Sequence, residues 1–567
     1  MLSHRNRALT TAAALMLATA PGLARAADPA PTGAVLSPAE INAIVTAPLP
    51  ADQAAMKAHV MFLAADALKG RDASSPEYAI AAQYVAAQFY AAGLKPAGDD
   101  GGYLQRVPLV AYKPADNGSF ALTAPGKPAV ALDYGVDYVP SANPAAKETR
   151  VDAPIVFVGH GIVAPDYGRN DYAGVDVRGK IVAFFGGAPK GFNSEVRAHF
   201  LNPATKAATA AQHGAVGVIQ LESMARPARG TFSFALAKAG AARERTTWET
   251  SDGTGAPALD SAPVLATFSL AGAAKLFAGT GQTWAKIARR SADDNAVFRA
   301  KPLAVTLQAV TRTSFVATSS SNIIGVIPGS DPVVGKEIVV LSAHLDHIGV
   351  GKGTTGDQIN NGAEDNAVGI ASLIEEAKRF AASGTPPRRT IMFLAVTAEE
   401  KGLVGSDFYA RNPTVPRDHI VANVDLDMPI LTYPFEDVIA FGADRSTLGP
   451  IVRRAVAGMG LVVSPDPIPD EAIFVRSDHY RFVQQGVPAV FLWPGQMGPG
   501  KAATEDFLAR HYHRPSDDLS LPIDWSQGVR FVDANYRISR AIADAPDRPR
   551  WNKGDFFGTL YHGLGAQ

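Results

Sequence analysis

Residues 337–347 read EIVVLSAHLDH, an apolar run that ends in two histidines and an aspartate. The Ile and Val residues are typical of a buried strand, which we predict over 337–342. Similar runs predict strands over 390–396, 420–426 and 487–493, and helical patterns occupy 368–382, 404–411, 448–457 and 529–543. Strands that alternate with helices predict a three-layer α/β domain with a mixed, largely parallel central sheet.

The residue pattern is different on the N-terminal side of this domain. Residues 133–303 contain short Val and Ile runs separated by Gly and Pro, such as APIVFVGHG and GKIVAFFGG, with a helical pattern at 204–213. This predicts a smaller, strand-rich inserted domain, and it has no tight cluster of His and acids that would give it chemistry of its own. The main domain then comprises residues 304–545 together with an N-terminal part, residues 51–132, which includes a helix capped by Ser75.

The two ends of the chain have separate interpretations. Residues 1–26 have a basic start, an apolar run and an Ala-Arg-Ala ending, which is typical of a cleaved secretory signal and predicts export to the periplasm or the medium. The apolar run is short for a membrane span, and no longer one follows. Residues 27–50 are expected to form a loose lead-in, and residues 546–567 a tail of unknown role.

Composition excludes several classes of partner. The 567 residues include 53 Lys and Arg, 54 Asp and Glu and no Cys, and removing the predicted signal would remove three arginines and no acid. The slight acidic excess and the lack of a long basic cluster argue against binding to nucleic acid or to an anionic membrane. Disulfides are excluded, so stability must come from the packed core. The oligomeric state is left open.

Acids and histidines follow three of the predicted strands. His344 and Asp346 follow the first, Glu399 and Glu400 the second, and Asp427 the third. Sites in such sheets form beyond the carboxyl ends of the strands. Imidazole and carboxylate ligands suit zinc or a similar divalent cation, and one carboxylate can serve as a base beside the metal.

Other residues have plainer alternatives. Asp365 precedes a predicted helix, where Asp is a frequent N-cap, and His513 stands in a loop. Asp425 and Asp427 alternate with apolar residues and share one side of a strand, so Asp425 competes with Asp427 as a ligand. His347 is expected to lie at the surface or to pack in the core without a specific task. Glu364, the acid next to Asp365, is expected to be exposed.

In this order the motifs resemble those of the M28 family of co-catalytic zinc peptidases. TAEEKGLVGS at 397–406 and SDHYRFVQQGVPAVFL at 477–492 look like family motifs, and FLAADALKGR at 62–71 looks like the family's N-terminal portion. The resemblance covers about 56–110 and 314–543. Within the insert, YAGVDVRGKIVAFFGG and AAQHGAVGVIQ resemble a protease-associated domain.

The resemblance implies a role for each matching residue. One zinc would be held by His344, Asp365 and Asp427, and a second by Asp365, Glu400 and His513, with Asp365 bridging the two. Glu399 would be the general base. Asp346 would be a carboxylate that orients the ligands without binding the metal itself. Tyr512 would stabilise the oxyanion. The family segment usually reads Asn-x-Asp-Met, whereas this chain has Asp425-Leu-Asp427-Met428.

The expected function is an exported dinuclear zinc aminopeptidase that cleaves N-terminal peptide bonds with a metal-bridged water. A carboxypeptidase or a dipeptidase on the same scaffold is an alternative, because the ligands do not distinguish the two ends of a peptide. An alternative of another class is a non-catalytic binding protein of the same fold, which degenerate ligands would favour. A cyclising transferase related to the family is a minor alternative.

Overall fold

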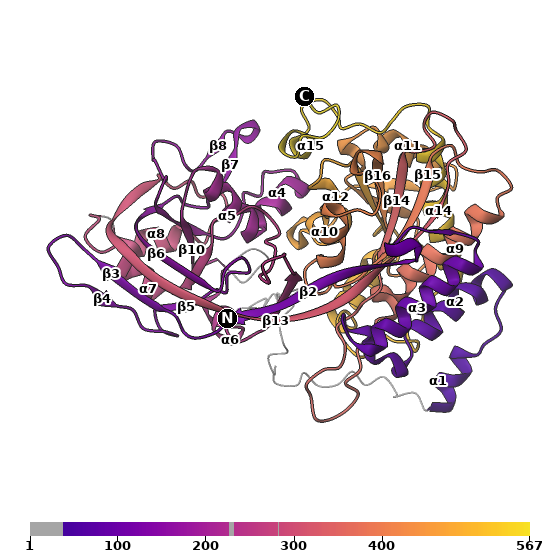
Figure 1. The fold of residues 1–567 in the computed structure, drawn as a ribbon, viewed down its shortest axis with the longest axis horizontal. Coiled ribbons are helices and arrows are strands. Elements are labelled where there is room, and N and C mark those ends of the chain that lie inside the picture. Colours follow the sequence, from indigo (N-terminus) through magenta and orange to yellow (C-terminus); the bar gives the residue numbers. More distant parts are fainter. Residues whose placement is uncertain (1–37, 226–231, 282) are drawn as a thin grey trace, which may run out of the picture.

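The computed structural model describes residues 38–225, 232–281 and 283–567, and they form two lobes (Figure 1). The larger lobe is formed mainly by the chain on both sides of the predicted insert, and the smaller lobe mainly by the insert. The signal predicted at 1–26 lies outside the described residues. A short helix, α1 (Pro38–Val45), lies in the predicted lead-in. Within the described ranges, no helix is both long and apolar enough to cross a membrane.

A mixed sheet forms the centre of the larger lobe, with the strand order β2–β13–β15–β14–β16–β19–β17–β18. Strands β14, β15, β16 and β19 are mutually parallel, whereas β13 and β17 are antiparallel to β15 and β19. The predicted fold class is confirmed. The strands span β2 (Leu104–Pro114), β13 (Lys301–Ile327), β14 (Ile338–His344), β15 (Thr390–Val396), β16 (Ile420–Asp425), β17 (Asp437–Phe441), β18 (Val462–Ser464) and β19 (Ala489–Pro494).

Helices cover both faces of this sheet, because successive side chains of each buried strand point to opposite sides. Val339 and Leu341 of β14 join the core formed with α2, α3, α9, α11 and α14. Val340 packs on the other face with Tyr409 of α10 and Phe482 of α12. The helices span α2 (Ala51–Leu63), α3 (Pro76–Ala91), α9 (Val368–Ala382), α10 (Val404–Arg411), α11 (Leu448–Ala457), α12 (His479–Val483), α13 (Gly500–Arg510), α14 (Trp525–Asp544) and α15 (Phe556–Leu560).

The smaller lobe is built on a second sheet, with the order β5–β12–β10–β9–β6–β13–β3–β4. Strand β13 belongs to both sheets and runs between the lobes without a break at residue 303 (Figure 1). Strands β3 and β4 precede residue 133, so this sheet begins earlier in the chain than the predicted insert. Its other elements span β3 (Ser119–Thr123), β4 (Val130–Ala131), β5 (Tyr138–Pro140), β6 (Glu148–Phe157), β9 (Ile181–Phe185), β10 (Gly217–Leu221), β12 (Val264–Phe268), α4 (Ser194–Leu201), α5 (Pro203–Gln212), α6 (Phe234–Ala239), α7 (Leu270–Leu276) and α8 (Trp284–Arg290).

The two lobes also meet through α4 of the smaller lobe. His199 on this helix is buried, and its Nδ1 lies 2.8 Å from the hydroxyl of Tyr480 on α12. Phe556 and Phe557 of α15 pack edge-on against the same imidazole. The predicted C-terminal tail therefore lies at the contact between the lobes.

This contact predicts a loss of stability in acid. Burial, together with the charge of Lys206, lowers the pKa of His199 to about 3, whereas a free imidazole titrates near 6.5. Between these two values the unfolded chain binds a proton that the folded chain does not, so stability falls as the pH falls. One such group can change the free energy of unfolding by at most about 1.4 kcal/mol per pH unit. Urea unfolding between pH 7 and 4.5 should give a smaller pH slope for His199→Gln than for the wild type. Equal slopes would show that His199 does not titrate in this way.

Candidate metal centre

Six polar side chains converge beyond the carboxyl ends of the central strands: His344, Asp365, Glu399, Glu400, Asp427 and His513. His344 is the last residue of β14, Glu399 and Glu400 follow β15, and Asp427 follows β16. Because these strands are parallel neighbours, their ends lie along one edge of the sheet. The positions that the sequence predicted therefore come together in space.

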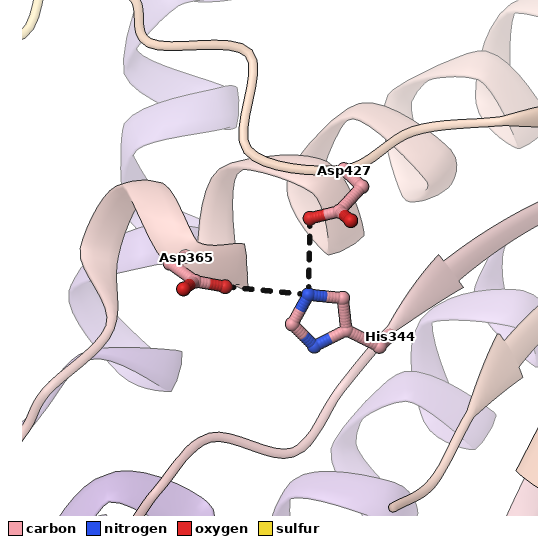
Figure 2. A group of neighbouring side chains, drawn as sticks. All are labelled: His344, Asp365 and Asp427. Carbon is pink, nitrogen blue, oxygen red and sulfur yellow. Dashed lines mark hydrogen bonds and ion pairs between the residues drawn. The ribbon is translucent and has the colours of Figure 1, made fainter. Parts of the chain in front are cut away.

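The first group of ligating atoms surrounds His344 (Figure 2). Its Nε2 lies 3.1 Å from Oδ1 of Asp427 and 3.3 Å from Oδ1 of Asp365. Its Nδ1 donates to the backbone carbonyl of Asp346 at 3.0 Å. This bond turns Nε2 toward the two carboxylates and fixes the orientation of the ring.

The second group surrounds Glu400. Nε2 of His513 lies 3.2 Å from Oδ2 of Asp365 and 3.2 Å from Oε2 of Glu400. His513 comes from the loop between α13 and α14, and Asp365 from the segment before α9. The two oxygens of Asp365 thus face different imidazoles, His344 and His513, and this carboxylate links the two groups.

His347 also belongs to this cluster, which corrects the expectation that it would have no specific task. It is fully buried, and its Nδ1 lies 2.7 Å from Oε1 of Glu400 and 3.9 Å from Oδ2 of Asp365. Glu400 is therefore held between two imidazoles, those of His347 and His513. The sequence contained a signal for this, since His347 follows the same strand as His344.

Glu364 is buried rather than exposed, so that expectation was wrong. Its Oε1 accepts the N–H of Leu431 at 2.8 Å. Asp517, which the sequence did not single out, is also buried and accepts the N–H groups of Glu364 at 2.8 Å and Asp365 at 3.0 Å. These bonds fix the backbone on which the bridging carboxylate stands.

Asp346 has a similar task for the two glutamates. It is fully buried, its Oδ1 accepts the N–H of Glu399 at 3.0 Å, and its Oδ2 accepts the N–H of Glu400 at 3.3 Å. One carboxylate thus positions two neighbouring acids whose side chains face different parts of the site. Glu399 faces a pocket, whereas Glu400 contacts His347 and His513.

The pocket beside the first group has a polar and an apolar side. Tyr512 stacks on His513 with the ring centroids 3.8 Å apart, and its hydroxyl accepts a hydrogen bond from Nη2 of Arg476 at 3.3 Å. Arg476 comes from a loop before α12, and no sequence pattern pointed to it. The pocket is lined by His344, Asp365, Glu399, Asp427, Met428, Ile473, Arg476, Ser477, Phe491, Trp493, Leu508, Tyr512 and His513.

The structure separates Asp427 from its competitor Asp425. Asp427 contacts His344 and lines the pocket. Asp425 is fully buried and accepts hydrogen bonds from the hydroxyls of Ser342 and Ser477, both at 2.6 Å. The contacts therefore favour Asp427 as the ligand and give Asp425 a structural role.

These contacts predict opposite effects for two isosteric substitutions. Asp427→Asn should weaken metal binding and leave folding nearly unchanged. Asp425→Asn should keep the metal but lower the free energy of unfolding by about 1–3 kcal/mol, because an amide nitrogen replaces one buried acceptor. Metal analysis and urea unfolding of both variants test this assignment. If Asp427→Asn kept its metal and Asp425→Asn lost it, Asp425 would be the ligand instead of Asp427.

The electrostatics of the site favour a cation. Burial by itself lowers the pKa of His513. The carboxylates of Glu400 and Asp365 have the larger effect and raise this pKa to about 10. For Glu400 burial raises the pKa, while His513 lowers it to about 2. Burial, with the charges of Glu400 and Asp427, raises the pKa of Glu399 well above its usual value, against the influence of His344. Closely spaced carboxylates of this kind require positive charge between them.

The donor set fits divalent metal ions. The ligating atoms of His344, Asp365 and Asp427 lie within 4.8 Å of one another, and so do those of His347, Asp365 and Glu400. Imidazole and carboxylate are the ligands that zinc takes in catalytic sites. His344, Asp365 and Asp427 would hold one ion, and Asp365 with Glu400 and an imidazole would hold another.

Residues 322–538, which carry the whole ligand set, match the model of peptidase family M28. Residues 322–538 are therefore assigned to peptidase family M28. It is 30% identical over 175 residues to leupeptin-inactivating enzyme 1 of Streptomyces exfoliatus, which covers 31% of this chain and 36% of that protein. It is 28% identical over 93 residues to the vacuolar membrane protease of Pyricularia oryzae, covering 16% of this chain and 8% of that protein. The matches thus span about a third or less of these relatives.

Two solved structures align with this chain over most of its length. An aminopeptidase from Aneurinibacillus sp. strain AM-1 has a TM-score of 0.46 and 20% identity, covering 88% of this chain and 98% of that one. A zinc aminopeptidase from Bacillus subtilis has a TM-score of 0.41 and 17% identity, with the same coverage of both chains.

Proposed function

We propose that this chain is an exported dinuclear zinc aminopeptidase of the M28 family. The observation that carries the proposal is the position of Asp365, whose two oxygens face His344 and His513 separately at 3.3 and 3.2 Å. A carboxylate placed in this way can bridge two ions. Export is proposed from the residue pattern of the first 26 positions alone.

The proposed ligands follow from this bridge. His344 and Asp427 would complete the first site, and Glu400 and His513 the second. His513 is favoured over His347 because it lines the pocket, whereas His347 is fully buried and contacts Glu400 from behind. Two zinc ions bound here would lower the pKa of a shared water and polarise the substrate carbonyl.

Glu399 is proposed as the general base. It lines the pocket beside His344 and Asp427, and Asp346 fixes its backbone. A carboxyl group whose pKa is raised can take a proton from water and return it to the leaving amine near neutral pH. Arg476 donates to the oxygen of Tyr512, which leaves the phenol O–H free to donate to the developing oxyanion.

Cleavage at the N-terminus is proposed from the family resemblance, and the preferred side chain from the residues that line the pocket. Met428, Ile473, Phe491, Trp493 and Leu508 form an apolar wall beside the ligands. Such a wall suits one apolar side chain next to the scissile bond. We therefore expect a preference for an apolar N-terminal residue.

The test is a comparison of blocked substrates. Leucyl anilide and leucyl dipeptides with a blocked C-terminus should be cleaved, their N-acetylated forms should not, and a chelator should abolish cleavage. Cleavage that instead requires a free C-terminus would favour the carboxypeptidase alternative. Purified protein that binds metal but cleaves none of these peptides would favour a non-catalytic role.

A further inference from the structure

Arg71 is a fully buried cation beside the metal centre, and it lies outside residues 322–538, the part of the chain that matches the family model. It lies at the end of η1 (Asp66–Arg71), more than 200 residues before the first ligand, and is 1% exposed. Burial lowers the pKa of its guanidinium to about 10, against the charges of Asp517, Asp346, Asp365 and Glu400, so it stays charged at neutral pH. A buried charge is costly unless all its donors are used.

The donors of Arg71 go to backbone carbonyls of three segments. Nε donates to Leu345 at 3.0 Å. Nη1 donates to Asn361 at 2.6 Å and also to Leu63, and Nη2 donates to Gly362 at 3.1 Å. The planar guanidinium has five N–H groups in a fixed fork, so it can hold several carbonyls at once, which a lysine ammonium cannot do in the same geometry.

The carbonyls that Arg71 holds belong to the segments that carry the ligands. Leu345 lies between His344 and Asp346, and Gly362 lies three residues before the bridging Asp365. One side chain therefore ties the loop after β14 to the loop before α9. These two loops must keep a fixed separation if His344 and Asp365 are to share an ion.

The neighbouring backbone strengthens the same connection. The N–H of His347 donates to the carbonyl of Arg71 at 3.3 Å. The side chain of Asn361 donates to the carbonyl of Ala64 and to the carboxylate of Asp66, both at 2.8 Å. The 63–71 segment is thus bound to both ligand-bearing loops at several points.

We propose that Arg71 is a positioning residue of the metal centre, and that the N-terminal segment around it is needed for tight metal binding. It sets the distance between the loop of His344 and the loop of Asp365, and its positive charge reduces repulsion among the carboxylates. The proposal rests on the dinuclear centre proposed above.

The test compares Arg71→Met with a matched control, Arg389→Met. Arg389 is also fully buried and donates to the carbonyls of Ile542 and Ala543, but it lies just before β15, at the opposite end of that strand from Glu399. The readouts are the zinc dissociation constants from chelator competition, the absorption spectrum after cobalt substitution, and the melting temperature of the metal-free protein.

Arg71→Met should weaken the binding of at least one zinc by about tenfold to hundredfold, as is usual when a group that orients ligands is removed. Its cobalt spectrum should change, whereas Arg389→Met should lower the melting temperature and leave both zinc constants within about twofold. Arg71→Lys, which keeps the charge, should show a smaller loss of affinity and is the variant to measure if Arg71→Met does not fold.

Unchanged zinc constants in the folded Arg71 variants would overturn the inference, as would an equal loss in Arg389→Met. Wild-type protein that binds no metal at all would overturn the proposed function instead, so the two failures can be distinguished.

Discussion

Replacing Glu399 by glutamine is expected to remove nearly all turnover while both metal ions stay bound. The amide has nearly the same shape as the carboxylate, but it cannot accept a proton from water at neutral pH. Loss of a general base lowers turnover by about 10²–10⁴-fold. Glu399 lines the pocket, whereas its neighbour Glu400 contacts His347 and His513 and is the proposed metal ligand. Metal analysis and steady-state kinetics on the same preparation measure both effects.

A matched control for this substitution is Glu375→Gln. Glu375 lies on α9 and pairs with His59 and Lys378, outside the ligand set. It should keep the wild-type turnover and the wild-type metal content. A fully active Glu399→Gln enzyme would contradict the role of Glu399, and loss of metal from that variant would make Glu399 a ligand instead.

The second large effect is expected for Asp365→Asn. Because Oδ1 faces His344 and Oδ2 faces His513, an asparagine places one amide nitrogen where an oxygen ligand is needed. Bound metal should fall from two equivalents to one or none, and turnover by about 10³-fold or more, since the water shared by two ions would be lost. Zinc analysis after dialysis and kinetics with added zinc are the measurements.

Asp533→Asn is the control for this variant, because Asp533 of α14 pairs with Arg379 of α9 and Arg537 of α14, outside the ligand set. Both variants remove one carboxylate charge, but only Asp365→Asn should lose metal. An Asp365→Asn protein with two tightly bound ions would show that this carboxylate is not the bridge.

The sequence predicted the sheet and the strand-end acids because both depend on local pattern. Apolar runs fix where a strand ends, so the residues that follow it are known to lie at the site edge. The predicted helix at 368–382 coincides with α9 and the predicted strand at 390–396 with β15. Strand β13 was not predicted, although its alternation of exposed and buried residues runs through residue 303.

The partners of the ligands could not be predicted in the same way. Arg71, Glu364 and Asp517 act through hydrogen bonds to backbone groups far away in the sequence, and no spacing rule marks such contacts. Arg476 reaches Tyr512 only because two loops fold over the same strand ends. His347 could be seen in the sequence, but its role depends on its contact with Glu400, which only the structure shows.

The most direct test of the dinuclear centre is X-ray diffraction from zinc-loaded crystals, with anomalous data collected at the zinc edge. Two peaks about 3.5–4 Å apart are expected, one beside His344 and Asp427 and the other beside Glu400 and His513, with Asp365 in contact with both. A single peak, or two peaks that do not share Asp365, would contradict the proposed site and the reaction derived from it.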